Sequence, residues 1–279
     1  MTVSPAYLDG AEEAGLLSRH QGLPFVAGGY DEPVTGERQF LVTHCDPELV
    51  RRPAWWSELV RLARRADPAA EAIVLRVPGD ISPPAPWRRL ITYLRHEGQV
   101  EGGSTAADDT PVSVLPATAE HRPLIARWLA TALTAAADAH GSPGRSAPPD
   151  VVDSLLDAPG RASYVVVDEG TVIGHATLLD DTYDDVTGRH TVELFDILVE
   201  AGDGLRRRAT TALTAVAAAH AADRDLPLLG NVVHSPTLTS DPGERVVATL
   251  TARGWLTDHV LWRLALPPEP TGTAAGAGR

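Results

Sequence analysis

The stretch TVELFDILVEAGDGLRRRATTALTAVAAAHAA, residues 191–222, decides the fold of this chain. It begins as an apolar strand, passes a glycine-bearing turn and continues as a long helix. Arg206, Arg207 and Arg208 stand in the expected first turn of that helix. Because a helix N-terminus carries partial positive charge, arginines there are unfavourable unless an anion lies near them. The stretch therefore predicts either a site for a phosphate-bearing ligand or a later helix start, with the arginines on a solvated turn.

Composition limits the function classes open to this chain. The 279 residues contain 24 basic side chains, all arginine, and carry a net charge of −13. The absence of lysine excludes lysine-based catalysis. The negative charge disfavours nonspecific binding to nucleic acid, because affinity for phosphate depends on clustered positive charge. Abundant Ala, Gly, Pro and Arg are typical of a GC-rich coding sequence, such as an actinobacterial one. We expect a protein that handles small molecules or proteins.

Cysteine usage and hydropathy point to a cytoplasmic protein. Cys45 is the single cysteine, so neither an intrachain disulfide nor a multi-cysteine metal site can form. No histidines and carboxylates show HExxH-type spacing, so we expect no metal. The N-terminus is acidic where a signal peptide is basic, and no segment approaches the roughly 20 apolar residues that span a bilayer. We expect no membrane association.

The first part of the chain, residues 1–105, is predicted to be a small α/β unit. Residues 1–38 are rich in Gly, Pro and acidic side chains and predict loops and short helices. Strands are expected at 40–43 and 72–77, and helices at 53–66 and 86–96. The polar segment 101–111, EGGSTAADDTP, is the expected linker.

After this linker the chain carries a fuller set of elements. Two β-rich runs are joined by Glu169 and Gly170, which predicts a hairpin. The segment DDTYDD, residues 180–185, is expected to be an acidic loop. The predicted strands are 112–115, 164–168, 171–179, 192–199, 228–233 and 260–266, and the predicted helices are 119–137, 150–156, 205–222 and 244–253. The tail 267–279 is predicted to be disordered.

This order of elements over residues 112–266 resembles the GNAT superfamily of acyl-CoA-dependent N-acyltransferases. The segment GERVVATLTARGW, residues 243–255, is similar to the last helix of that superfamily and its closing Gly-aromatic pair. The segment YVVVDEGTVIGHATL, residues 164–178, is similar to its second and third strands. The resemblance implies an α/β fold in which a mixed central sheet is flanked by helices. The first unit is interpreted either as a degenerate half-GNAT module or as an unrelated extension that covers the sheet.

The resemblance also implies acetyl-CoA, or another acyl-CoA, as co-substrate. Members of the superfamily hold the pyrophosphate on a glycine-rich loop at a helix N-terminus, and this chain has RRRATT instead. Charge on the arginines can replace part of that loop, but a degenerate loop is equally what a retired site would show. The residues implied in binding are Ile197, Leu198 and Val199, whose backbone would hold the pantetheine arm, and Arg206, Arg207, Arg208, Ala209, Thr210 and Thr211.

Catalytic groups transfer only in part. A tyrosine that often protonates the leaving thiolate aligns with Leu250, and a common asparagine aligns with Gly243, so neither role carries over. Tyr183 and His234 remain candidates for the acid. For the base, the resemblance implies a carboxylate on the strand 192–199, and strand alternation places Glu193 and Asp196 on opposite faces. Glu193, Asp196 or neither serves as base. His234 is either a general base or substrate contact, or a loop histidine with ordinary hydrogen bonds.

Tyr183 and Asp184 lie in the predicted acidic loop, which would either attract a cationic amine or form a solvated hairpin tip. We expect an N-acyltransferase, most simply an acetyltransferase, that acts on a small amine or amino-acid-like acceptor in specialised metabolism. Two alternatives stay open. One is a noncatalytic GNAT-like binding module, and the other is an enzyme that takes its acyl group from the thioester of an acyl carrier protein.

Overall fold

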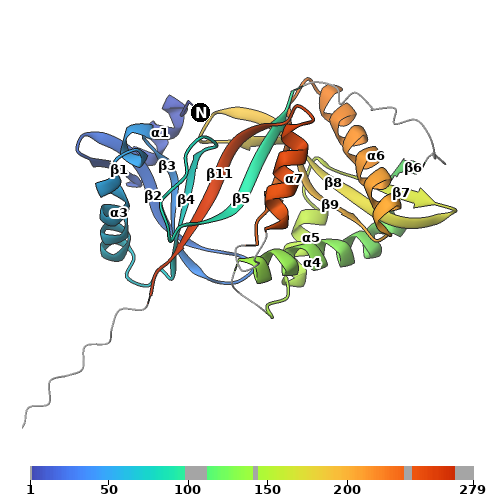
Figure 1. Cartoon of the computed structure of the whole chain (residues 1–279), viewed down its shortest axis with the longest axis horizontal. Helices are drawn as coiled ribbons and strands as arrows, with labels where there is room; N and C mark the ends of the chain where they lie inside the picture. The colour runs from blue at the N-terminus through green and yellow to red at the C-terminus, as the bar shows by residue number, and fades with distance from the viewer. Residues whose placement is uncertain (1, 98–111, 141–143, 236–240, 268–279) are drawn as a thin grey trace, which may run out of the picture.

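The computed structural model describes residues 2–97, 112–140, 144–235 and 241–267, and these build a mixed α/β protein. The described residues contain an 11-stranded sheet in the order β1-β2-β3-β4-β11-β5-β10-β9-β8-β7-β6. Helices cover the sheet, as Figure 1 shows. The predicted fold class is confirmed. The predicted linker 101–111 lies outside the described residues, as does the predicted tail from residue 268 onward.

The first part of the chain contains more regular structure than its composition predicts. Residues 1–38 were expected to form loops and short helices, but they form one helix and two strands before a third strand begins. The glycines of the second strand are not breakers, because the space beside Gly29 is filled by the side chains of Arg38 and Asp67. The elements are α1 (Pro5–Glu13), β1 (Leu17–His20), β2 (Leu23–Asp31), β3 (Arg38–Cys45), α2 (Pro47–Val50), α3 (Pro53–Ala66), β4 (Ala72–Pro78) and β5 (Arg88–His96).

The predicted helix 86–96 is wrong, because this segment forms strand β5. Its apolar residues fit a helical stripe, but they also alternate, and Leu90, Thr92, Leu94 and His96 are buried on one face. Strand β5 pairs along its length with β10 and β11. This pairing with distant strands favours the two-residue period of a strand over the 3.6-residue period of a helix.

The second part of the chain follows the predicted order. Glu169 and Gly170 have φ values of 46° and 79°, which is the geometry of a two-residue hairpin turn. The acidic segment 180–185 is not a loop, because the strand it follows continues to Asp184. The elements are β6 (Ser113–Pro116), η1 (Ala119–His121), α4 (Arg122–Ala139), α5 (Pro149–Leu156), β7 (Arg161–Asp168), β8 (Thr171–Asp184), β9 (Arg189–Val199), α6 (Asp203–Ala222), β10 (Leu228–Val233), α7 (Pro242–Thr251) and β11 (Leu256–Ala265).

The two parts of the chain exchange strands at the centre of the sheet. Strands β3 and β4 are parallel and joined through α3, and strands β9 and β10 are parallel and joined through α6. Strand β5 leaves the first part to pair with β10, while β11 leaves the second part to pair with β4. Strands β5 and β11 also pair with each other. The division of the chain at residues 105–112 remains a prediction.

Three groups of buried side chains hold the helices on the sheet. Helix α3 packs Trp55 and Leu59 on β3 and β4. Helix α6 packs Ala209 and Leu213 on β8 and β9, and α4 packs Trp128 on the opposite face of the same strands. Among the residues that the structure describes, no helix is both long and apolar enough to cross a bilayer.

Candidate active site

The candidate site lies where the parallel strands β9 and β10 separate. The two strands pair only over 192–194 and 228–230, although β9 continues to Val199 and β10 to Val233. At the point of separation, the side-chain Nδ2 of Asn231 donates a hydrogen bond to the backbone carbonyl oxygen of Phe195 at 3.1 Å. Beyond it, the edge of β9 that faces β10 pairs with no strand among the residues that the structure describes.

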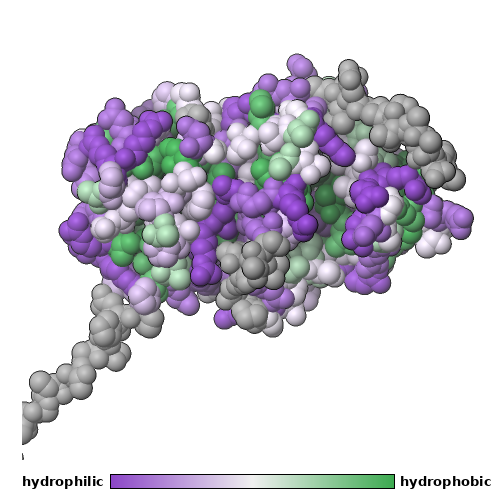
Figure 2. Space-filling view, viewed as in Figure 1, coloured by the Kyte–Doolittle hydropathy of each residue, from purple (hydrophilic) through white to green (hydrophobic). Residues whose placement is uncertain are grey.

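A cavity of about 250 Å³ fills this opening. Helices α6 and α7 border it, and Figure 2 shows hydrophobic residues in the hollow between these helices, with hydrophilic residues around it. Of the predicted binding residues, Ile197 and Thr210 line the cavity, whereas Leu198 packs with the side chains around α4. The lining residues are Leu194, Phe195, Asp196, Ile197, Thr210, Thr214, Gly230, Asn231, Val232, Val233, Val246, Leu250 and Trp255.

A β-bulge in β9 overturns the expectation that Glu193 and Asp196 point to opposite faces. Leu194 pairs with Leu178 of β8, but the next pair joins Asp196 to Thr177, so Phe195 is an extra residue. Because one extra residue inverts the alternation, Glu193 and Asp196 lie on the same face, the one that α4 covers farther along. Both candidate carboxylates therefore lie on one face of β9, but of the two only Asp196 lines the cavity.

The Glu193 carboxylate has no hydrogen-bond or ion-pair partner among the side chains that the structure describes. The residue is partly buried, and this burial raises the pKa of its carboxyl group above the usual value. Glu193 pairs with Leu229 of β10, and Asn231, two residues along β10, pairs with Tyr93 of β5. Tyr93 therefore lies on the same face of the sheet as Glu193. A carboxylate with a raised pKa beside an opening between strands is suited to accept a proton.

Asp196 has a different environment. Its Oδ2 atom lies 3.1 Å from Nε2 of His175, a fully buried residue of β8. The ring of His175 stacks on Trp128 of α4, with ring planes 4° apart and centroids 5.3 Å apart. One carboxylate of β9 is therefore held by a neighbour while the other is not.

The three arginines lie in the second turn of α6, not in its first. The helix begins two residues earlier than the predicted start at residue 205, with Gly202 as N-cap and Asp203 in the first turn. The Arg206 guanidinium bonds back to the carbonyl oxygen of Ala201 at 2.6 Å. Arg207 and Arg208 are exposed, and Ala209 is buried under the helix. No side chain caps the helix start, so its first N–H groups face outward.

His234 has a structural environment. It is fully buried at the end of β10, with Nε2 2.8 Å from the Thr92 hydroxyl and Nδ1 2.5 Å from Asp241 Oδ2. Asp241 caps α7 through the backbone N–H of Gly243. Ligand atoms of His234, Asp241 and Glu244 lie within 4.8 Å of one another, but Glu244 is paired with Arg89. His234 is not among the residues that line the cavity.

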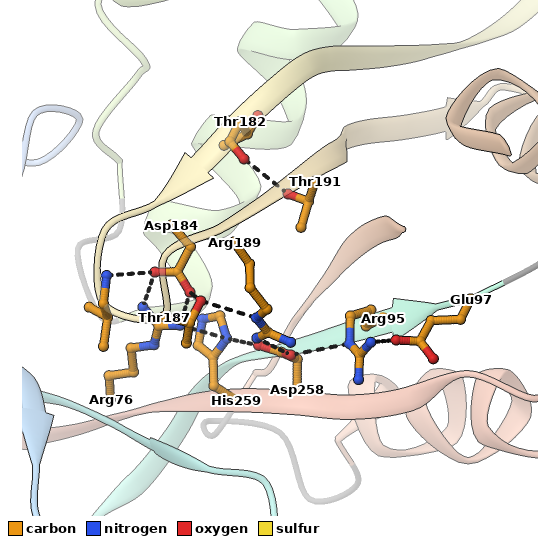
Figure 3. A network of polar contacts seen from close by, with 11 residues as sticks. Arg76, Arg95, Glu97, Thr182, Asp184, Thr187, Arg189, Thr191, Asp258 and His259 are labelled. Atoms are coloured by element: carbon orange, nitrogen blue, oxygen red, sulfur yellow. Dashed lines mark hydrogen bonds and ion pairs between the residues drawn. The ribbon is translucent and has the colours of Figure 1, made fainter. Parts of the chain in front are cut away.

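The two predicted substrate residues lie at the end of the β8–β9 hairpin. Tyr183 is exposed and contacts His190. Asp184 forms a two-point ion pair with Arg76 of β4, with contacts of 2.7 and 2.6 Å. Figure 3 shows this pair within a network of polar side chains that reaches Arg189, Asp258 and His259. Asp184 therefore ties the hairpin to the other half of the sheet.

Sequence reasoning assigned no site role to three residues that shape this site, namely Asn231, His175 and Trp128, and it interpreted His175 as structural. The pair Gly230–Asn231 interrupts the apolar strand LLGNVV, and such a break is a usable sign of close backbone approach. His175 and Trp128 belong to different elements, and nothing in their spacing predicts that their rings stack.

Comparisons with known proteins give structural neighbours only. No family model matches this chain, and no curated protein matches it. Solved structures similar to it include an acetyltransferase of the GNAT family from Colwellia psychrerythraea (12% identity, 94% of each chain covered, TM-score 0.47). A GCN5-related N-acetyltransferase from Kribbella flavida is similar at 12% identity (96% of each chain, TM-score 0.45). A functionally unknown conserved protein from Staphylococcus epidermidis is also similar, at 8% identity (84% of this chain and 85% of that protein covered, TM-score 0.48).

Proposed function

We propose that this chain is an acyl-CoA-dependent N-acyltransferase that acts on a small amine. The observation that carries the proposal is the separation of β9 and β10 after Leu194 and Gly230, which opens a cavity of about 250 Å³ lined by Asp196, with Glu193 on the same face of β9. A thioester arm fits such an opening, because the free edge of β9 offers backbone groups that can hydrogen-bond to it and polarise its carbonyl.

The chain's own residues can supply the proton transfer. An acceptor amine arrives as its ammonium ion, and Glu193 takes one proton from it, directly or through water. The neutral nitrogen then attacks the thioester carbonyl carbon, the C–N bond forms, and the C–S bond breaks. The second proton that the nitrogen loses goes to the leaving thiolate, directly or through water. The products are the amide, the free thiol and one proton, which Glu193 returns to solvent.

The start of α6 is suited to the phosphate groups of the co-substrate. Its first N–H groups carry no side-chain cap, and an uncapped helix start attracts anions. Arg207 and Arg208 add positive charge one turn later, although Asp203 in the first turn opposes it. We propose that these arginines strengthen phosphate binding and that the helix start provides the hydrogen bonds.

One observation favours a second candidate, a protein that receives its thioester on an acyl carrier protein. Helix α6 begins at Asp203, so the backbone N–H of Arg206 donates to the carbonyl oxygen of Gly202 within the helix and is unavailable to a pyrophosphate. A carrier-bound thioester needs the opening between strands but not a pyrophosphate cradle. The exposed arginines would then face an acidic carrier.

Calorimetric titration with acetyl-CoA tests the first proposal. We expect micromolar binding to the wild type, and at least a tenfold loss in the double variant Arg207→Ala/Arg208→Ala, because hydrogen bonds to charged groups contribute about 1.5 to 3 kcal/mol each. Arg206 stays unchanged because its side chain supports the helix start. The matched control is Arg61→Ala/Arg65→Ala, which removes two exposed arginines from α3.

Thiol release from acetyl-CoA in the presence of primary amines then checks turnover. If neither acetyl-CoA nor CoA binds, the acetyltransferase proposal fails. In that case, titration with an acylated carrier protein separates the second candidate from a noncatalytic binding module, since only the former releases acylated amine.

A further inference from the structure

A chain of buried polar side chains runs under the site, across β7 and β8 to the bulge in β9. Arg161 Nη1 donates to Ser163 Oγ at 2.8 Å, and Ser163 Oγ lies 3.0 Å from Thr177 Oγ1. Thr177 Oγ1 lies 3.1 Å from His175 Nδ1. His175 Nε2 in turn lies 3.1 Å from Asp196 Oδ2. Thr177 and His175 are fully buried and Ser163 is nearly so.

The guanidinium at one end fixes the first link of this chain. Arginine can only donate, so Ser163 Oγ accepts from Arg161, and it can then either donate to Thr177 Oγ1 or accept a second hydrogen bond from it. In the first arrangement Thr177 donates to Nδ1 of His175, and the neutral ring carries its proton on Nε2, which lies 3.1 Å from Asp196 Oδ2. The second arrangement places the proton on Nδ1, so the tautomer of His175 distinguishes the two.

Burial explains why these groups need one another. His175 Nε2 and Asp196 Oδ2 are both buried and lie 3.1 Å apart, but their geometry is not that of a hydrogen bond, and neither atom has a hydrogen-bond partner among the residues that the structure describes. An unsatisfied buried donor and an unsatisfied buried carboxylate oxygen are each costly, so a cationic ligand on Asp196 would satisfy the carboxylate that the His175 contact leaves incompletely paired. The parallel stack on Trp128 fixes the ring plane, so the Nε2–H direction is fixed as well.

We propose that Asp196 binds the acceptor amine as its ammonium ion, and that His175 is a positioning residue that holds the Asp196 carboxylate for this contact. The inference rests on the proposed N-acyltransferase function and names its acceptor as a cationic primary amine. Asp196 lines the cavity and keeps 16% of its side chain exposed, so it can receive a ligand while Oδ2 is held from behind.

The two carboxylates of β9 thereby take separate roles. Glu193 has no side-chain partner to hold it and accepts the proton, whereas Asp196 is held by a donor and serves as a fixed anion. Other charged groups near Asp196 are Glu193 on its own strand, Arg161 at the far end of the chain, and Arg127, which lies 5.8 Å from the Trp128 ring. None of them forms an ion pair with Asp196.

Nuclear magnetic resonance tests the buried chain without reference to catalysis. Long-range nitrogen–proton correlations of His175 in the full chain should show the Nε2–H tautomer. Thr177→Val removes the donor to Nδ1 while keeping side-chain volume, so the single tautomer should be lost. Titration with propylamine should shift the His175 nitrogens in the wild type but not in Asp196→Asn. A Nδ1–H tautomer in the wild type, or equal shifts in both proteins, would overturn the proposal.

Kinetics of the acyl-transfer reaction test the assignment of roles. Asp196→Asn should raise the KM for the amine about tenfold or more, because one hydrogen bond to a charged group is lost, and should leave the KM for acetyl-CoA unchanged. His175→Phe, which keeps the ring stack, should do the same, and His175→Gln, which keeps an N–H donor, should restore part of the affinity.

The outcomes separate the two proposals. If no amine is acylated, the proposed function fails and the resonance data alone judge the buried chain. If amines are acylated but His175→Phe lowers only thermal stability and leaves the amine KM unchanged, the proposed function stands and the role of His175 is wrong.

Discussion

At the residue scale, the site depends on the different burial and neighbouring side chains of two carboxylates on one strand. The bulge at Phe195 brings Glu193 and Asp196 to one face of β9. Asp196 gains a buried imidazole as neighbour, whereas Glu193 gains burial without a partner. Differences of this kind are how proteins assign separate acid, base and binding roles to identical chemical groups.

Glu193→Gln should lower kcat about 100-fold or more, the usual contribution of a general base, with little change in the amine KM. Because burial raises the pKa of Glu193 above 4.5, wild-type activity should fall as pH drops through that raised value, since the protonated carboxyl group cannot accept a proton. The pH profile of kcat measures this. A variant with wild-type kcat would exclude Glu193 as base.

The same substitution should stabilise the fold at neutral pH. A carboxyl group whose pKa is higher in the folded state makes stability fall as pH rises from its unfolded value to its folded value, because the folded protein must lose a proton it holds more tightly. Glutamine has no such loss. Thermal unfolding at several pH values should show the Tm difference growing with pH and then reaching a plateau.

At the element scale, the β8–β9 hairpin is a long arm held by the opposite half of the sheet. Its end is anchored by Asp184 on Arg76, and Arg189 of the hairpin bonds Asp258 of β11 at 2.7 Å. Burial acts to raise the pKa of Asp258, but hydrogen bonds from His259 and Arg189 outweigh it and hold this pKa below its usual range. Because β9 carries both candidate carboxylates, this anchor positions the site as well as the hairpin.

Asp184→Asn should cost about 3 kcal/mol of unfolding free energy, since it leaves the Arg76 guanidinium, 10% exposed, without its ion-pair partner. Burial acts to raise the pKa of Asp184, but the bonds from Arg76 and Thr187 outweigh it, so the pKa lies below 3.8. The stabilisation is therefore complete above the unfolded pKa and is lost as pH falls through the folded one.

Chemical denaturation at neutral and acidic pH measures this difference. The matched control is Asp185→Asn at the exposed neighbouring position, which should change stability by only a few tenths of a kcal/mol. Equal effects of the two substitutions would show that the hairpin does not depend on this ion pair.

At the scale of the whole molecule, the exchange of β5 and β11 makes the two halves interdependent. The parallel pair β3–β4 of the first half is flanked by β11 of the second half, and the parallel pair β9–β10 of the second half is flanked by β5 of the first. Without the partner, β4 and β10 would present unpaired edges and exposed apolar surface. The halves therefore share one folding unit, whatever their origin.

Fragments 1–105 and 106–279, expressed separately, should each fail to fold, whereas coexpression should yield a soluble complex. Circular dichroism and solubility measure the outcome, and the intact chain, which should unfold in a single cooperative transition, is the control. Two fragments that fold independently would support the predicted division into units and contradict the interdependence argued here.

Elements with local patterns could be predicted in both parts of the chain. The helix 53–66 and the strand 228–233 agree with the structure at both ends, and the Glu169–Gly170 turn follows from two residues with positive φ. The segment 86–96 could not be assigned in the same way, because its apolar spacing satisfies two periods and its partners β10 and β11 lie far away in the chain.

The sequence by itself determined the α/β class, the order of elements from residue 112 onward and the strand that carries the candidate carboxylates, because hydrophobic period and turn residues act over a few positions. Only the tertiary structure decided that Glu193 and Asp196 share a face, that Asp184 binds Arg76, and that a buried chain ends at His175. Each of these depends on strand register and on contacts between distant segments. Register is a property of pairs of strands, so no single stretch of sequence contains it.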